Sequence, residues 1–264
     1  MVITFLTDFG LQDDFVGTCH GVMARIAPDA RVIDLTHGIP PQAVLQAAVV
    51  LQATLPYLPV GVHLAVVDPG VGGDRRAIAV RTGDGRQFVG PDNGLLLLAA
   101  DELGIDAVHE LANPAYRLPD VSFTFHARDL FSPAAAHLAA GVPIAELGPA
   151  VPPGDLVRVA VPEPEIGRAQ VGATVLSIDR FGNVATNLRR RHLDALAPAG
   201  GVVELRLAFD RYHATVARTF ADAATGELLL LEDSYGFVTV AVNQGNAARL
   251  TGVKAGDELR VAHV

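Results

Sequence analysis

The sequence has one cysteine and no tryptophan among its 264 residues. A single cysteine, Cys19, excludes a disulfide within the chain, so we expect a reducing compartment and assign the protein to the cytoplasm. Its apolar runs are too short, or too often broken by proline, to span a bilayer, and no membrane helix is expected. The first residues also lack the basic segment and small-residue cleavage site of a signal peptide.

Positive charge is scarce as well: 20 Lys and Arg residues face 29 Asp and Glu residues, for a formal net charge of −9. A surface that binds nucleic acid needs clustered Lys and Arg to neutralise phosphates, so no nucleic-acid partner is expected. The one basic run, Arg189 to Arg191, is interpreted as the solvated start of a helix. Aromatic residues make up 6% of a chain that is 50% hydrophobic, which leaves Val, Ala and Leu to fill the core.

Several motifs of metal and nucleophile chemistry are missing. The sequence contains no His-x-x-x-His or Cys-x-x-Cys pair, and we expect neither a metal nor an organic cofactor. One alternative stays open, because Asp8, Asp68 and His126 from separate segments could converge on an ion. The Gly-x-Ser-x-Gly elbow of serine hydrolases and the Walker loop of phosphate-binding enzymes are absent too.

The first part of the chain alternates strand-like and helix-like segments. Strands are predicted at 2–6, 31–35, 62–67, 77–80 and 87–89, and helices at 15–26, 42–53, 95–103 and 133–140. This alternation predicts an α/β domain in which a mostly parallel sheet carries helices on both faces.

The second part is strand-rich and follows a proline-rich stretch. Strands are predicted at 172–178, 202–208, 213–216, 227–231, 237–242 and 258–261, which favours a smaller all-β, barrel-like domain or a sandwich. We therefore divide the chain into an α/β domain over 1–150 that carries the catalytic residues, a proline-rich linker over 151–168 and a barrel-like domain over 169–264.

Acidic side chains follow two of the predicted parallel strands. Asp8 comes after the first strand and Asp68 after the third, and each precedes glycines that allow a sharp turn and a close approach of a ligand. The polar turn Pro91 to Gly94 could face the same ligand, although an ordinary cap of the next helix is the favoured interpretation.

His126 is the first candidate for a working residue. It lies in the segment Phe125-His126-Ala127-Arg128-Asp129, where an ion pair between Arg128 and Asp129 that caps the next helix would explain both charged residues. That interpretation leaves the imidazole without a structural purpose, and imidazole titrates in the physiological range.

The strand-rich part carries one comparable segment, Asp179-Arg180-Phe181-Gly182-Asn183. Within five residues, the acid can bind an amine and the aromatic face can stack on a flat ring. The amide can form hydrogen bonds to the edge of a base. A plain β-turn built around Gly182 and Asn183 is the alternative.

Together these segments are more specific than any of them alone. Thr7-Asp8-Phe9-Gly10, Leu35-Thr36-His37-Gly38-Ile39-Pro40, Val67-Asp68-Pro69-Gly70-Val71-Gly72, Pro91-Asp92-Asn93-Gly94, Phe125 to Asp129, Ile178 to Asn183 and Asp233-Ser234-Tyr235-Gly236 occur in this order along the chain. The series resembles the S-adenosylmethionine hydrolase family, also called S-adenosylmethionine hydroxide adenosyltransferases, which is related to fluorinase and chlorinase. The resemblance covers nearly the whole chain.

The resemblance implies an enzyme that hydrolyses S-adenosylmethionine to adenosine and methionine by attack of water at the ribose C5′. It implies a homotrimer whose sites lie between the first domain of one chain and the second domain of its neighbour. Asp68, Arg75 and His126 match the catalytic set, with Arg76 as the alternative to Arg75. The implied substrate-binding residues are Asp8 for the ribose, Asp13 and Asp179 for the ammonium group, Ser234 and Tyr235 for the carboxylate, Asn183 and the backbone at Ala247 for adenine, and Phe181 and Phe220 for stacking.

Within that set, we expect His126 to accept the proton of water and Asp68 to orient either the imidazole or the water. Arg75 is expected to keep the acid ionised and to stabilise the developing hydroxide. Two other functions stay open. One is a chlorinase-like halide transferase, and the resemblance weighs against it, because this chain has Val71 and Ala127 where the fluorinases use hydroxyl side chains to hold the halide. A non-catalytic sensor of S-adenosylmethionine or adenosine would not need the catalytic set.

Overall fold

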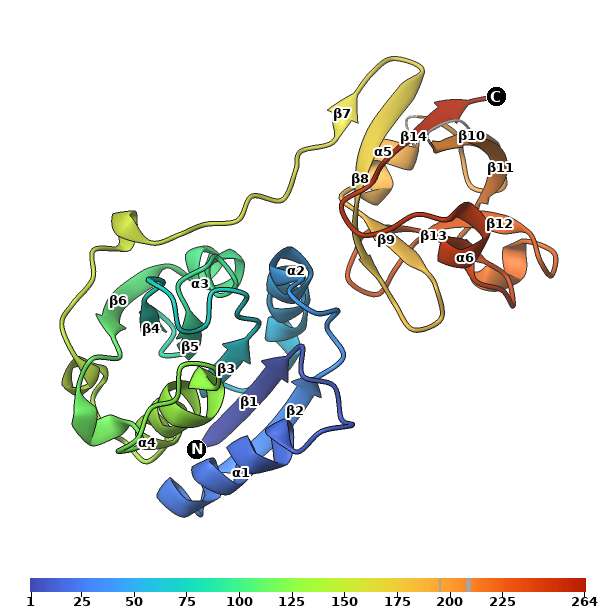
Figure 1. The fold of residues 1–264 in the computed structure, drawn as a ribbon. Helices are drawn as coiled ribbons and strands as arrows, with labels where there is room; N and C mark the ends of the chain where they lie inside the picture. The colour runs from blue at the N-terminus through green and yellow to red at the C-terminus, as the bar shows by residue number, and fades with distance from the viewer. Residues whose placement is uncertain (195, 208–209) are drawn as a thin grey trace. The chain divides into compact units, whose positions relative to one another are not determined.

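The computed structural model describes residues 1–194, 196–207 and 210–264, and it divides into two compact units, Met1–Ala160 and Val161–Val264 (Figure 1). The predicted end of a strand at Ala208 lies outside the described residues. The division falls inside the segment predicted as a linker. Its first part is attached to the first unit, where the Val157 amide donates to Asp92 Oδ1 at 2.9 Å and Arg158 forms an ion pair with Asp101.

The first unit is a six-stranded sheet in the order β2-β1-β3-β5-β4-β6. Its strands are β1 (Val2–Thr7), β2 (Arg31–Thr36), β3 (Val62–Val66), β4 (Ala77–Thr82), β5 (Gln87–Pro91) and β6 (Ile105–Glu110). Strands β2, β1, β3 and β5 run parallel, whereas β4 pairs antiparallel with β5 and with β6. The predicted mostly parallel sheet is confirmed, and β6 is a strand that the sequence pattern did not reveal.

Helices cover both faces of this sheet (Figure 1). On one face α1 (Phe15–Ile26) and α4 (Ser132–Ala139) pack against Ile3, Phe5 and Leu64, and on the other α2 (Val44–Thr54) and α3 (Leu97–Leu103) pack against residues such as Phe88. Because β1 and β3 are buried on both faces, their sequences are nearly continuous apolar runs and show no alternation.

The second unit is a closed barrel. Seven strands run in the order β14-β10-β11-β12-β13-β9-β8, and β8 pairs with β14 to close the ring, so a sandwich is excluded. The short β7 (Glu165–Ile166) adds to β8 outside this ring. The barrel strands are β8 (Gln170–Ile178), β9 (Val184–Thr186), β10 (Val202–Leu207), β11 (Asp210–Val216), β12 (Leu228–Glu232), β13 (Val238–Val242) and β14 (Glu258–His263), accompanied by the short helices α5 (Arg190–Asp194) and α6 (Ala247–Thr251).

Two titratable groups are buried in the core of the first unit. Burial raises the pKa of the Cys19 thiol on α1 to about 11, although the neighbouring Ser132 acts in the opposite direction. His63 on β3 is fully buried, and burial followed by the charge of Arg86 lowers its pKa to about 4. In the described residues no helix is both long and apolar enough to cross a membrane.

Candidate active site

The carboxyl ends of β1, β3 and β5 lie at one edge of the sheet, because these strands are parallel neighbours. Asp8 follows β1, and its Oδ2 accepts a hydrogen bond from the backbone amide of Gln42 at 2.9 Å. Gln42 has a φ of +66°, a conformation that non-glycine residues adopt rarely. Asp68 follows β3, and Asn93 from the end of β5 donates its Nδ2 to the carbonyl of Val67 at 2.8 Å.

The polar turn after β5 is a structural element. Asn93 Oδ1 accepts from the amide of Leu95 at 3.2 Å within the turn itself. The predicted cap of the next helix is wrong, because α3 begins at Leu97 with Leu96 as its N-cap and no side chain caps it. The buried Asp92 accepts from Arg76 Nε at 2.9 Å. Arg76 also donates to the carbonyl of Asp155 and is thereby turned away from Asp68.

Arg75, in contrast, lies directly on Asp68. Its Nε donates to both carboxylate oxygens at 2.9 and 3.0 Å, and its Nη2 lies 2.5 Å from Oδ2. Side-chain exposure is 11% for Arg75 and 7% for Asp68, so the pair is largely shielded from water. A two-pronged contact of this kind fixes the guanidinium plane as well as its position.

The same guanidinium reaches His126. Arg75 Nη2 lies 2.7 Å from His126 Nδ1. Guanidinium has only donors, so Nδ1 must be the acceptor, and in the neutral ring the proton sits on Nε2. Burial, followed by the charge of Arg75, lowers the pKa of His126 below its usual 6.5. The neutral imidazole is therefore the favoured form at pH 7.

The surroundings of Arg75 restrict its position further. Its guanidinium carbon lies 5.3 Å from the centre of the buried Phe131 ring, within the range of a cation–π contact. A side chain at Gly70 would place a Cβ 3.1 Å from Arg75 Cγ, so glycine leaves the room that the arginine stem occupies.

The backbone around His126 is held by Asp129. This carboxylate is fully buried, and it accepts from the amide and hydroxyl of Ser122 at 2.8 and 2.7 Å and from Arg128 Nε at 2.6 Å. Burial opposes ionisation, but these hydrogen bonds prevail and lower the pKa of Asp129. The predicted Arg128–Asp129 pair is confirmed, but it does not cap the next helix, because α4 begins without a side-chain cap. His126 immediately precedes a single turn of π-helix, Ala127–Phe131, which leads into α4, and such turns are frequent at functional sites.

Asp13, the remaining residue predicted for substrate contact in this unit, is exposed in the bend before α1. The structure therefore joins Asp68, Arg75 and His126 into one hydrogen-bonded chain, with Asp8 after the adjacent strand. Sequence reasoning missed Gln42 and Phe131, because neither belongs to a polar motif and only the fold brings them to this edge.

In the second unit, Asp179 organises the turn between β8 and β9. Its Oδ1 accepts from the amides of Phe181 and Asn183 at 2.8 and 2.9 Å, and its Oδ2 accepts from Asn183 Nδ2 at 2.8 Å. Gly182 has a φ of +84°, so the segment is a tight turn. The turn leaves the Phe181 ring 68% exposed, and a flat ligand can stack on it.

The other predicted contacts of this unit form two groups. The Gly182 carbonyl accepts from the amide of Ala248 at 2.9 Å, which places the buried Ala247 beside the Asp179 turn. Phe220, 43% exposed, starts the short helix Phe220–Asp222, and the carbonyl of the following Ala223 accepts from Asn243 Nδ2 at 2.8 Å.

Ser234 and Tyr235, both exposed, lie in the turn that precedes β13. Since β9 and β13 are antiparallel, this turn and the Asp179 turn lie beyond opposite ends of their pairing. The structure thus brings Asp179, Phe181, Asn183 and Ala247 together, and it places Ser234 and Tyr235 on a different turn, the one between β12 and β13.

We predict that Gly182→Ala destabilises the second unit more than Gly226→Ala. Both glycines have positive φ, at +84° and +86°, but a Cβ at Gly182 would lie 2.0 Å from the Asn246 side chain, whereas the space around Gly226 is open. Asn246 caps α6 through the Arg249 amide, and loss of such a cap costs about 1 kcal/mol. Urea unfolding should therefore separate the two variants by about that amount; equal stabilities would show that the turn adapts freely.

Comparisons with known proteins agree with this division into two units. Residues 3–148 match the model of the SAM hydroxide adenosyltransferase N-terminal domain, and residues 173–260 match that of the C-terminal domain. A protein of Salinispora arenicola named (R)-S-adenosyl-L-methionine hydrolase is 52% identical, over 98% of this chain and 97% of its own length. A fluorinase of an Actinoplanes species is 30% identical over 97% and 95%.

A solved structure shows the same fold. The crystal structure of an uncharacterized conserved protein from Thermotoga maritima has a TM-score of 0.91 and 39% sequence identity to this chain, and the comparison covers 99% of this chain and 100% of that one.

Proposed function

This chain belongs to the SAM hydroxide adenosyltransferase family, and from that membership we propose that it hydrolyses S-adenosyl-L-methionine (SAM) to adenosine and L-methionine. The observation that carries the proposal is the hydrogen-bonded chain of Asp68, Arg75 and His126 at the edge of the sheet. A relative that is 52% identical over nearly the full length and is named a hydrolase supports the use of water, and the fluorinase is more distant at 30%.

The reaction joins the oxygen of water to the ribose C5′ and breaks the bond between C5′ and sulfur. The bonding electrons go to the sulfonium, which leaves as the neutral thioether of methionine, while the water oxygen becomes the 5′-hydroxyl of adenosine and releases one proton. Because a positive charge on sulfur disappears, a site that excludes bulk water favours this step. Fixing the oxygen in line with the breaking bond contributes further.

The hydrogen-bond pattern changes the catalytic roles that we expect for Asp68 and His126. His126 was expected to accept the proton, but its Nδ1 lone pair is engaged by Arg75, and Nε2 carries a proton. We infer that Nε2–H donates to the water and holds it. Asp68, whose carboxylate keeps lone pairs beyond those that Arg75 uses, is then the group that takes the proton.

The remaining contacts are proposed from the family pattern. Asp8 holds the ribose hydroxyls, Asp13 and Asp179 hold the ammonium group, and Ser234 and Tyr235 hold the carboxylate. Asn183 and the backbone at Ala247 read adenine, with Phe181 and Phe220 stacking on it. We further propose a homotrimer, acting in the cytoplasm, in which each site combines the two units of neighbouring chains; a trimer mass in light scattering is the result expected.

The name of the Salinispora relative specifies the (R) form of SAM. The sulfonium carries three different carbon substituents and is a stereocentre, so we propose that this chain also acts on the (R) epimer. Turnover of each purified epimer by the same preparation measures the preference, and equal rates would remove the stereochemical part of the proposal.

Product analysis in ¹⁸O-water tests the reaction itself. One ¹⁸O atom at the 5′ position of adenosine, with unlabelled methionine, is the expected result. The same incubation with chloride or fluoride tests the alternative suggested by the fluorinase relative: a 5′-halogenated adenosine as the main product would replace the hydrolase with a halide transferase. Binding of SAM without any product would identify a sensor.

The pH profile of kcat/KM should have an acid limb with a midpoint below 6.5. Protonation of His126 puts a hydrogen on Nδ1 against the Arg75 guanidinium, and because burial and that charge lower the pKa of His126, the active neutral form persists below pH 6.5. His126→Asn places an amide oxygen in the position of Nδ1 and should remove this limb while lowering the rate. An unchanged limb in that variant would assign it to another group.

A further inference from the structure

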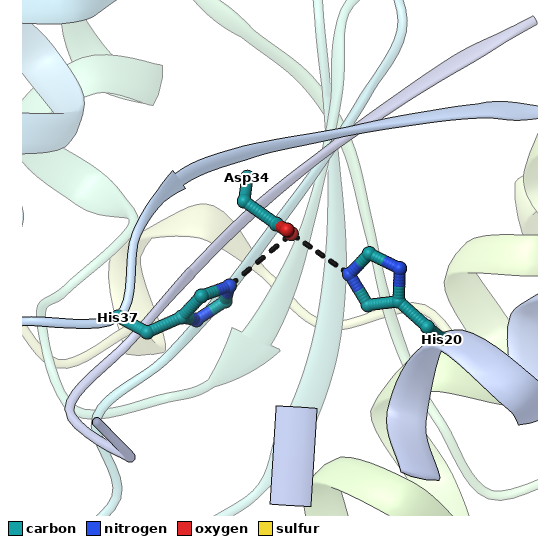
Figure 2. Close-up of side chains that lie close together, drawn as sticks. All are labelled: His20, Asp34 and His37. Atoms are coloured by element: carbon teal, nitrogen blue, oxygen red, sulfur yellow. Dashed lines mark hydrogen bonds and ion pairs between the residues drawn. The ribbon is translucent and has the colours of Figure 1, made fainter. Parts of the chain in front are cut away.

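Two imidazoles and a carboxylate that have no part in the site proposed above lie close together in the first unit (Figure 2). His20 lies on α1, Asp34 on β2 and His37 just after β2. His20 Nε2 is 2.8 Å from Asp34 Oδ1, and His37 Nε2 is 3.1 Å from the same oxygen. In the described part of the chain, this is the group of three potential ligands whose donor atoms lie close together, all within 4.8 Å.

His37 is oriented by the fold and has one nitrogen left over. Its side chain is 2% exposed, and its Nδ1 shares a 2.8 Å hydrogen bond with Thr7 Oγ1. Its Nε2 points toward the cluster in Figure 2, yet it has no hydrogen-bond partner among the described residues, since the 3.1 Å contact with Asp34 is not aligned for one. A buried nitrogen that faces a carboxylate without a hydrogen bond needs another partner.

The donor set suits a transition ion. Two imidazoles with one carboxylate are the ligands of many zinc and iron sites, and a ligating histidine usually has its other ring nitrogen held by a hydrogen bond. Thr7 provides that hydrogen bond to His37. Ligands around a tetrahedral ion with bonds of about 2.0–2.1 Å lie roughly 3.3 Å apart. The two His–Asp gaps would widen slightly, and the side chains of His20 and Asp34 are 34% and 42% exposed and free to adjust.

We propose that His20, Asp34 and His37 bind a divalent first-row transition ion of the zinc class, with water completing the coordination. No Lys or Arg competes for the carboxylate, because the ion pairs of Asp34 in the described residues are with these two histidines. The site is separate from Asp68 and His126, and the ion has no part in the hydrolysis proposed above.

An ion at this position would connect α1, β2 and the loop that carries Asp8. The His37 carbonyl accepts from the amide of Gly10 at 2.7 Å, and Thr7, the partner of its ring, immediately precedes Asp8. The bound ion would therefore stabilise the Asp8 loop, which gives the site a structural purpose.

Titration of the EDTA-treated full-length chain with Zn²⁺ by calorimetry, and with Co²⁺ by visible absorption, tests the proposal. We expect one ion per chain, a d–d absorption band for Co²⁺ and a higher Tm with Zn²⁺. His20→Ala and Asp34→Asn should weaken binding by at least about tenfold. His213→Ala, which removes an exposed histidine from the second unit, serves as the matched control and should bind as the parent chain does.

Equal affinity in the parent chain, His20→Ala and Asp34→Asn would overturn the proposal and place the ion elsewhere. The same holds if the parent chain binds neither metal. His37→Ala is left out of the comparison because loss of its contact with Thr7 could disturb the loop itself. None of the readouts is an activity measurement, so the result does not depend on the proposed hydrolysis.

Discussion

Asp68→Asn should lower kcat by about 100- to 1,000-fold and change KM by less than about threefold. The asparagine Nδ2 cannot accept from Arg75, so the two-pronged contact at 2.9 and 3.0 Å is lost and the guanidinium is free to turn away from His126. The proposed proton acceptor disappears in the same substitution. Neither change touches the contacts expected to bind the substrate, so the loss should fall on kcat.

Asp74→Asn is the matched control for this experiment. Asp74 is an exposed acid in the same loop, and its replacement changes the net charge by the same amount. Initial rates over a range of SAM concentrations separate kcat from KM for both variants, and circular dichroism checks that Asp68→Asn is folded. A rise in KM as large as the fall in kcat would show that Asp68 binds the substrate and does not act on water.

The parent chain should lose about 3 kcal/mol of stability from His63 alone as the pH falls from 6.5 to 4. Burial lowers the pKa of this histidine from 6.5 to about 4 in the folded state. Between these values the unfolded chain takes up a proton that the folded chain does not, so stability decreases as the solution becomes more acidic. The surroundings of the ring disfavour its protonated form. The centre of the His63 ring lies 5.1 Å from that of Phe88, and its Nε2 has no hydrogen-bond partner in the described residues.

Urea unfolding at several pH values between 4 and 7 measures this effect. His63→Gln keeps an acceptor for the Thr4 hydroxyl, now 2.9 Å from Nδ1, but cannot be protonated, so its stability should vary less with pH. His213→Gln removes an exposed histidine and should leave the slope of the parent chain unchanged. If His63→Gln and the parent chain have parallel pH profiles, the protonation of His63 is not coupled to folding.

The fold was predictable from sequence where burial leaves a strong pattern. The apolar runs of β1 and β3 and the helical spacing of α1 gave correct element types, because those segments pack on both sides of the sheet or along one helix face. β6 was missed, since at the edge of the sheet its sequence Ile105–Glu110 mixes polar and apolar residues. The closure of the barrel depends on the pairing of β8 with β14, whose partners such as Ala262 and Gln170 are far apart in the sequence, and no local pattern predicts it.

The candidate site was predictable in part. Asp8 and Asp68 could be placed at one sheet edge because parallel strands share it, and Arg75 was identified by resemblance next to an equally charged neighbour. Only the structure separates them, since Arg76 is occupied by Asp92. The tautomer of His126 and the group of His20, Asp34 and His37 stayed hidden for the same reason: both depend on which atoms face each other across distant segments.

Cys19 has a practical consequence for attaching labels to the two units. It is buried, and its thiol, with a pKa of about 11, is almost wholly protonated at neutral pH and nearly inert toward alkylating reagents. The native Cys19 therefore does not have to be removed before the chain is labelled with thiol-reactive dyes. One cysteine introduced at an exposed position in each unit would allow a donor and an acceptor dye to be attached. Energy transfer between those dyes would then report the separation of the α/β unit and the barrel during turnover.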